Sequence, residues 1–109
     1  MLQKLKQLFR PEDTKKKEEP TTHALTWQLP TRTGAPPSVR NGHSADVIDS
    51  KIFVFGGGDK AELLADLFVF DVRESTWSQP PCTGVAPPPR SRHCSAVIER
   101  NLYIWGGIG

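Results

Sequence analysis

The stretches KIFVFGGGDK (residues 51–60) and NLYIWGGIG (residues 101–109) decide the fold of this chain. After one polar residue, each holds a run of four apolar, mostly β-branched or aromatic residues and continues into a glycine pair, Gly56–Gly57 in one and Gly106–Gly107 in the other. Runs of this length and composition predict β-strands. The two stretches are fifty residues apart, which indicates an internal repeat.

The repeat extends far beyond these two strands. Residues 27–59 align without gaps with residues 77–109, and eleven of the 33 aligned pairs are identical. The identical pairs include Trp27 with Trp77 and His43 with His93. One such unit could be an ordinary turn beside a core tryptophan, but two units in register indicate a duplicated structural module.

Within the unit we expect four strands, over residues 43–48, 52–56, 66–71 and 76–79. The runs at 52–55 and 67–70 are apolar at every position, so these strands must be covered on both faces. Small antiparallel sheets that stack against one another provide such cover. Residues 49–51 and 99–101 supply the turn after the first strand, and Asn101 is a residue type able to take a left-handed conformation there.

This unit resembles the kelch repeat, whose length is about 50 residues. The resemblance rests on the glycine pair, on Phe70 followed after six residues by Trp77, and on an Arg-x-x-His opening at residues 40–43 and 90–93. It covers residues 27–109 and implies an all-β fold: a partial kelch-type β-propeller of four-stranded antiparallel blades. The residues of the structural motif are Trp27, His43, Gly56, Gly57, Phe70, Trp77, His93, Gly106 and Gly107.

The chain is therefore divided into a charged, flexible leader at 1–20 and a kelch-repeat region at 21–109. Residues 27–30 would form a lone outer strand, residues 40–80 a complete blade and residues 90–109 a half blade. Propellers close with about four to eight blades. We therefore expect a truncated piece of a longer propeller protein, whose isolated chain exposes apolar sheet faces and aggregates.

The leader differs from the rest of the chain in charge. Residues 1–20 hold six basic and four acidic side chains, whereas residues 21–109 hold eight of each. Its few apolar residues, between Leu2 and Phe9, recur at helical spacing. The leader is thus predicted to be a disordered or short helical tail, with a frayed terminus preferred over a peptide that docks on a membrane or a partner.

Composition excludes several other classes of protein. The net charge of +2 is too small for an evident nucleic-acid-binding protein. No apolar run approaches the roughly 18 residues of a membrane span. Cys82 and Cys94 lack metal-type spacing and are too few for a disulfide framework, and Cys94 is expected to be buried. We expect a cytoplasmic protein, with the nucleus as the alternative.

No group of residues predicts catalysis. His43 and His93 occupy one repeat position, which a structural role already explains, and Gly56–Lys60 lacks the spacing of a phosphate-binding loop. We predict no enzyme activity, no cofactor and no metal site. Within the kelch resemblance, the expected function is a non-catalytic protein–protein interaction scaffold. The alternative is a fragment of a kelch-type enzyme or metal-dependent specifier protein.

In a four-stranded meander alternate connections lie on the same rim, and in this sequence one of the two rims carries the longest ones. Basic residues flank these connections, which suggests an acidic peptide as the partner. The opposing interpretation is structural: the arginines would tie the blades to backbone carbonyls or to acids such as Asp66 and Asp71. The candidate partner-binding residues are Arg40, Asp59, Lys60, Glu62, Arg90 and Arg92.

Overall fold

A computed structural model describes residues 4–7 and 24–109, and every regular element in these residues is a β-strand. The predicted all-β class with antiparallel sheets is confirmed. The chain divides into two compact units, Met1–Thr31 and Arg32–Gly109. The strands are β1 (Lys4–Gln7), β2 (Leu25–Gln28), β3 (Ser44–Ile48), β4 (Lys51–Phe55), β5 (Leu67–Asp71), β6 (Thr76–Ser78), β7 (Cys94–Ile98) and β8 (Asn101–Trp105).

The first unit contains the antiparallel pair β1–β2, in which Lys4 lies opposite Gln28 and Gln7 opposite Leu25. Lys4–Gln7 is therefore a strand and not a short helix, which was one of the two forms expected for the leader. The outer strand expected at 27–30 begins two residues earlier, at Leu25, and is paired. The rest of the leader, with the predicted linker from Pro11 to Pro20, lies outside the described residues.

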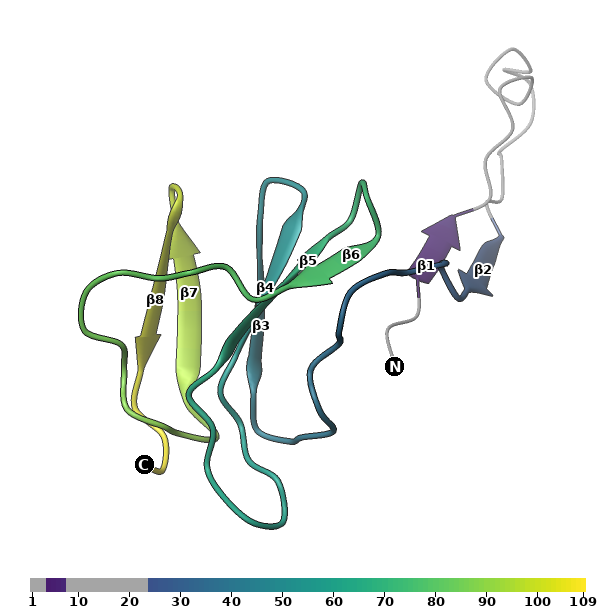
Figure 1. Cartoon of the computed structure of the whole chain (residues 1–109). Helices are drawn as coiled ribbons and strands as arrows, with labels where there is room; N and C mark the ends of the chain where they lie inside the picture. Colours follow the sequence, from purple (N-terminus) through teal and green to yellow (C-terminus); the bar gives the residue numbers. More distant parts are fainter. Residues whose placement is uncertain (1–3, 8–23) are drawn as a thin grey trace. The chain divides into compact units, whose positions relative to one another are not determined.

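The second unit begins with a four-stranded meander in the order β3-β4-β5-β6 (Figure 1). Its strands agree with the predicted ones to within two residues at each end. The registers place Ile52 beside Phe70 and Phe70 beside Trp77 on one face of the sheet. The rings of Phe70 and Trp77 lie 4.9 Å apart, so the two aromatic residues of the motif pack across neighbouring strands of one sheet.

The turn between β3 and β4 is two residues long, one residue shorter than expected, because Lys51 and Asn101 already belong to β4 and β8. Asp49 and Glu99, the first residues of the two turns, are left-handed, with φ of 55° and 58°. Asn101 instead begins β8 and pairs with Ile98. In each turn the left-handed residue is the one that directly follows the first strand. The third residue after that strand is already paired with the strand's last residue, Lys51 with Ile48 and Asn101 with Ile98.

The core of the second unit lies on both faces of the meander. Val54, Phe68, Phe70 and Trp77 are buried on one face, and Phe55 and Val69 are buried on the other. The unbroken apolar runs of β4 and β5 are explained by this two-sided burial. The face of Phe55 is the one that meets the next sheet.

The next sheet holds the antiparallel pair β7–β8, and its strand β7 packs beside β3 (Figure 1). The repeat is visible in the backbone as well as in the sequence, because left-handed residues recur at a spacing of fifty. The pairs, with their φ angles, are Gly34 (82°) and Gly84 (84°), Gly42 (70°) and Arg92 (58°), Asp49 (55°) and Glu99 (58°), Gly56 (67°) and Gly106 (76°), and Gly57 (97°) and Gly107 (86°).

Candidate functional site

A hydrogen bond and an aromatic contact join the two sheets of the second unit. His93 Nε2 lies 2.9 Å from Ser44 Oγ, at the start of β3. The His93 ring meets Phe55 edge to face, with ring centroids 5.6 Å apart and planes at 74°. Burial, assisted by the nearby charge of Arg90, lowers the pKa of His93 below its ordinary value of 6.5. A neutral imidazole therefore suits this seam.

The glycine pair after β4 allows the neighbouring chain to approach this seam closely. A Cβ on Gly56 would lie 2.8 Å from the carbonyl oxygen of Arg90 and 3.1 Å from the His93 ring. Gly57, with φ of 97°, donates its N–H to that same Arg90 oxygen at 2.9 Å. Two physical reasons for glycine, a positive φ and the close approach of a neighbouring backbone, are present at these positions.

Arg40 is buried at the base of the meander, with only 3% of its side chain exposed. Its guanidinium binds both carboxylate oxygens of Asp66 and also the carbonyls of Ser38 and Gly56. It lies 5.4 Å from the centre of the Phe68 ring. Arg40 is therefore engaged within the fold, and its guanidinium is not presented at the surface with the other candidates.

Arg90 repeats part of this arrangement in the second sheet. It donates to the carbonyls of Pro88 and Gly106 at 3.2 Å each, as Arg40 donates to those of Ser38 and Gly56. Within the described residues no carboxylate pairs with it. Its hydrogen bonds to these two carbonyls correspond to those of Arg40 fifty residues earlier.

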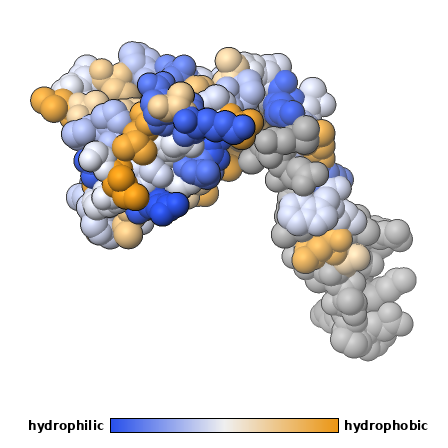
Figure 2. Space-filling view, turned by 90° about the horizontal axis from the view of Figure 1, so that it is seen from below, coloured by the Kyte–Doolittle hydropathy of each residue, from blue (hydrophilic) through white to orange (hydrophobic). Residues whose placement is uncertain are grey.

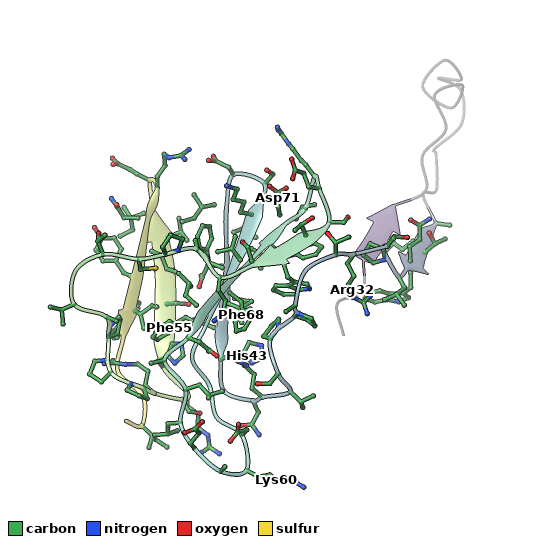
Figure 3. All side chains as sticks on the ribbon, in the orientation of Figure 1. Arg32, His43, Phe55, Lys60, Phe68 and Asp71 are labelled. Carbon is green, nitrogen blue, oxygen red and sulfur yellow. The ribbon has the colours of Figure 1, made fainter. Side chains whose placement is uncertain are left out.

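Three further candidates lie on the connection between β4 and β5. Asp59 Oδ1 accepts the N–H groups of Ala61 and Glu62 at 2.8 and 2.9 Å, and these bonds hold the pKa of Asp59 below its ordinary value. Asp59 thus fixes the turn, as Asp71 does by accepting the N–H of Arg73. Lys60 and Glu62 are exposed, and Figure 3 shows Lys60 at the outer end of the connection.

Arg92 is exposed and left-handed, at the position that Gly42 occupies in the first repeat. Its N–H donates to the carbonyl of Gly42 at 2.8 Å, which links the two equivalent segments directly. The internal repeat aligns Arg92 with Gly42, but nothing in the sequence indicates that the arginine has the same left-handed backbone conformation as the glycine. Its charged group is thereby presented at the surface on a fixed backbone.

The connections of the second unit are distributed unequally between its two rims (Figure 1). The two-residue turns after β3 and β7 and the turn from β5 to β6 lie at one rim. The longer segments at 56–66 and 79–93 run along the other, which contains the predicted binding residues. Figure 2 views this second rim and shows hydrophilic side chains interspersed with hydrophobic ones.

A groove of about 620 Å³ separates the meander from the second sheet, which the sequence did not predict. Phe53 and Leu67 contribute to one wall, Leu102 and Ile104 to the opposite wall, and the exposed connection 79–87 closes the outer side. The alternation of Leu102 and Ile104 along β8 is the signal that could have placed them together on one face.

The remaining chemistry-bearing residues are dispersed. Cys82 and Cys94 are both free and exposed, so the expectation of a buried Cys94 was wrong: its side of β7 is not covered by another sheet. In residues 4–7 and 24–109, no three metal-binding side chains cluster together. This same part of the chain contains no helix with the length and apolarity to span a membrane.

Comparison with known proteins agrees with the repeat geometry. Residues 14–109 match the model of the KLHDC2/KLHL20/DRC7 Kelch-repeats domain. Over 52 residues, 44% of this chain and 14% of the relative, the chain is 46% identical to the Rab9 effector protein with kelch motifs of Xenopus laevis. Over 58 residues, 51% of this chain and 9% of the relative, it is 36% identical to acyl-CoA-binding domain-containing protein 5 of Arabidopsis thaliana.

The chain thus corresponds to a small part of these longer relatives, while the family model spans most of its own length. The antiparallel sheets, the glycine pairs against the neighbouring backbone and the repeated left-handed positions are the structural counterpart of that match. The chain belongs to the kelch-repeat family, whose general role is that of a protein-interaction scaffold.

Proposed function

We propose that this chain is a non-catalytic scaffold, a piece of a larger kelch propeller, and that its rim of long connections binds an acidic segment of another protein. The observation that carries this proposal is that some basic side chains on that rim are bonded within the fold while others are exposed. Arg40 is fully engaged in the structure, whereas Lys60 and Arg92 project from two different connections into solvent. Two separated, free cations suit an extended acidic peptide.

The existing contacts of the titratable side chains support a non-catalytic role. His93 is bonded to Ser44, and Asp66 to Arg40. The carboxylate of Asp71 fixes the turn that follows β5. Each of these groups already stabilises a strand, a turn or a seam, so the fold itself accounts for its presence.

The proposal of a larger propeller follows from the uncovered face of the second sheet. Phe55 lies against His93 of the next repeat and is buried. Trp105, at the same repeat position in β8, is 51% exposed, and Tyr103 beside it on that face is 49% exposed. The face of the first sheet that holds Phe55 is covered by the next repeat, whereas the equivalent face of the second sheet, which holds Trp105, is uncovered. A further sheet would bury that face.

Binding of a fluorescent decapeptide of alternating glutamate and serine tests the rim. We expect Lys60→Glu and Arg92→Glu each to weaken binding by about threefold at low salt, the scale of a surface ion pair. Fluorescence anisotropy across a salt series measures the effect, and added salt should weaken binding further.

Arg73→Glu is the matched control, because Arg73 is an exposed arginine on the turn between β5 and β6, at the opposite rim. It makes the same change in net charge as Lys60→Glu and should leave the affinity nearly unchanged. Equal losses in all three variants would show general charge attraction instead of a site on the rim. Absence of binding by the wild-type chain would reject an acidic partner.

A further inference from the structure

An exposed serine contacts the nearly buried guanidinium of Arg40. Ser38 lies on the connection that leads into β3, and it is exposed. Arg40 Nη2 donates to the Ser38 hydroxyl oxygen at 3.1 Å, and Arg40 Nε donates to the Ser38 carbonyl at the same distance. Ser38 thus occupies one edge of the guanidinium with both its side chain and its main chain.

All five N–H groups of this guanidinium are used within the fold. Nη1 and Nη2 each donate to one carboxylate oxygen of Asp66, and Nη1 also donates to the carbonyl of Gly56. The second N–H of Nη2 and the N–H of Nε go to Ser38. The bonds to Asp66 and Gly56 are partly buried, whereas those to Ser38 are exposed. Solvent therefore reaches this cation on the side of Ser38.

The fold does not require a hydroxyl at this position. In the second repeat, Pro88 stands where Ser38 stands in the first. Arg90 Nε donates to the Pro88 carbonyl at 3.2 Å, just as Arg40 Nε donates to the carbonyl of Ser38. Proline has no side-chain acceptor for a second bond. The carbonyl contact thus belongs to the repeat, whereas the hydroxyl contact is particular to Ser38.

The exposure of Ser38 is a property of its place in the repeat. Pro88 is exposed as well. It is so even though the chain two residues later is bonded to the meander, where the Arg90 carbonyl accepts the N–H of Gly57 at 2.9 Å. Val39, directly after Ser38, is 94% exposed. An enzyme can therefore reach the Ser38 hydroxyl on the folded chain.

We propose that Ser38 is a phosphorylation site, modified by a protein kinase, and that Arg40 holds the phosphate on the rim of long connections. In the reaction, the hydroxyl oxygen of Ser38 forms a bond to the terminal phosphorus of a nucleoside triphosphate. The bond between that phosphorus and its bridging oxygen breaks, and the nucleoside diphosphate leaves. The hydroxyl proton passes to the kinase.

Phosphorylation replaces a neutral acceptor of Arg40 with an anion. A phosphoryl oxygen accepts the Nη2 N–H that the Ser38 hydroxyl accepted before, now in a charge-assisted hydrogen bond. Asp66 keeps its own two N–H groups, so the two anions share one cation from adjacent edges. The rim gains about two negative charges and repels an acidic segment. Only this last effect rests on the proposed function.

Access to Ser38 is tested with the synthetic peptide of residues 34–43, in which Ser38 carries the only hydroxyl. A serine kinase that phosphorylates this peptide with magnesium and adenosine triphosphate is applied to the folded full-length chain. Peptide mass spectrometry should locate the phosphate at Ser38, and Ser38→Ala should remove it. Modification that requires prior unfolding in urea, or that persists undiminished in Ser38→Ala, would overturn the inference.

The contact with Arg40 is tested by a phosphorus NMR titration of the modified chain. The second pKa of phosphoserine is about 6. The guanidinium favours the dianion and Asp66 partly opposes it, so we expect this pKa to be roughly half a unit lower in the folded chain than in the phosphorylated peptide. The difference should vanish in urea and in the double variant Arg40→Met with Asp66→Asn. Equal pKa values in the folded chain and the peptide would refute the contact.

The effect on the rim is measured with the fluorescent decapeptide of alternating glutamate and serine. The purified phosphorylated chain should bind it at least about threefold more weakly than the unmodified chain. Kinase-treated Ser38→Ala is the control and should bind as well as before treatment. Undiminished binding by the phosphorylated chain would overturn the regulatory effect. If the unmodified chain does not bind, the scaffold proposal fails, while mass spectrometry and the titration still decide on Ser38.

Discussion

Ser44 and His93 lie 49 positions apart in the sequence, yet the Ser44 hydroxyl and His93 Nε2 are 2.9 Å apart at the seam between two sheets. The serine is buried at the start of β3, and the histidine directly precedes β7. Phe55 supports the imidazole from the side. One residue of the repeat thus joins its own sheet to the preceding one.

Loss of this hydrogen bond should destabilise the second unit. Ser44→Ala is expected to reduce the free energy of unfolding by about 1 kcal/mol, the net worth of one buried hydrogen bond. Urea denaturation, monitored by tryptophan fluorescence, measures this loss of stability. Ser95→Ala is the control, because the Ser95 hydroxyl in β7 forms no hydrogen bond with the described residues, and it should cost clearly less. Equal losses would mean that the hydroxyl of Ser44 has no special role at the seam.

The same histidine predicts a dependence of stability on pH. Its pKa is lowered in the fold, so between the lowered pKa and 6.5 the unfolded chain binds more protons than the folded chain. Stability from this group is complete above pH 6.5 and falls as the pH decreases through that window. His93→Gln should flatten the acid side of the curve, whereas His43→Gln, which retains His93, should keep it. Denaturation midpoints from pH 8 to 5 (about one reading per half unit) test this.

The pair of Arg40 and Asp66 should be a larger source of stability than the seam. Asp66→Asn leaves a nearly buried guanidinium without its carboxylate, and we expect a loss of about 2 kcal/mol, below the range for fully buried pairs because Asp66 is 30% exposed. The double variant Arg40→Met with Asp66→Asn should lose less than the sum of the single variants. Strict additivity in denaturation experiments would contradict direct coupling.

The repeat itself made most of the fold predictable. Strands β3 to β8 follow from apolar runs, glycine pairs and a period of fifty, because backbone geometry and burial constrain those residue types locally. The partner of Arg40 was also within reach, since Asp66 was one of two acids considered for it. These features depend on neighbours within one unit or on the exact recurrence of a unit.

The features that escaped prediction depend on contacts without a local signal. The pairing of Lys4–Gln7 with β2 joins segments separated by the rest of the leader, and a four-residue strand is too short to show its period. The left-handed backbone of Arg92 is required by its place in the repeat, although its residue type argues against it. Cys94 is exposed because cover for a sheet face comes from another sheet, which its own sequence does not specify.

The open face of the second sheet should cause self-association. Trp105, Tyr103 and Ile98 are all about half exposed or more on this face. We expect sedimentation velocity to show the wild-type chain associating as its concentration rises, and Tyr103→Ser with Ile98→Ser to shift it towards monomer. Val85→Ser removes a fully exposed but isolated apolar residue and should change nothing. A monomeric wild-type chain at all concentrations would contradict this prediction.

The two glycines at equivalent repeat positions provide the most closely matched comparison. Gly34 and Gly84 share a left-handed backbone, so alanine should cost each about 1 kcal/mol from conformation alone. Only at Gly34 would the added methyl collide with the Trp77 carbonyl, at 2.2 Å. Gly34→Ala should therefore lower the free energy of unfolding at least twice as much as Gly84→Ala in parallel urea titrations. Equal costs would show that β6 does not hold the segment at Thr33 and Gly34 in place.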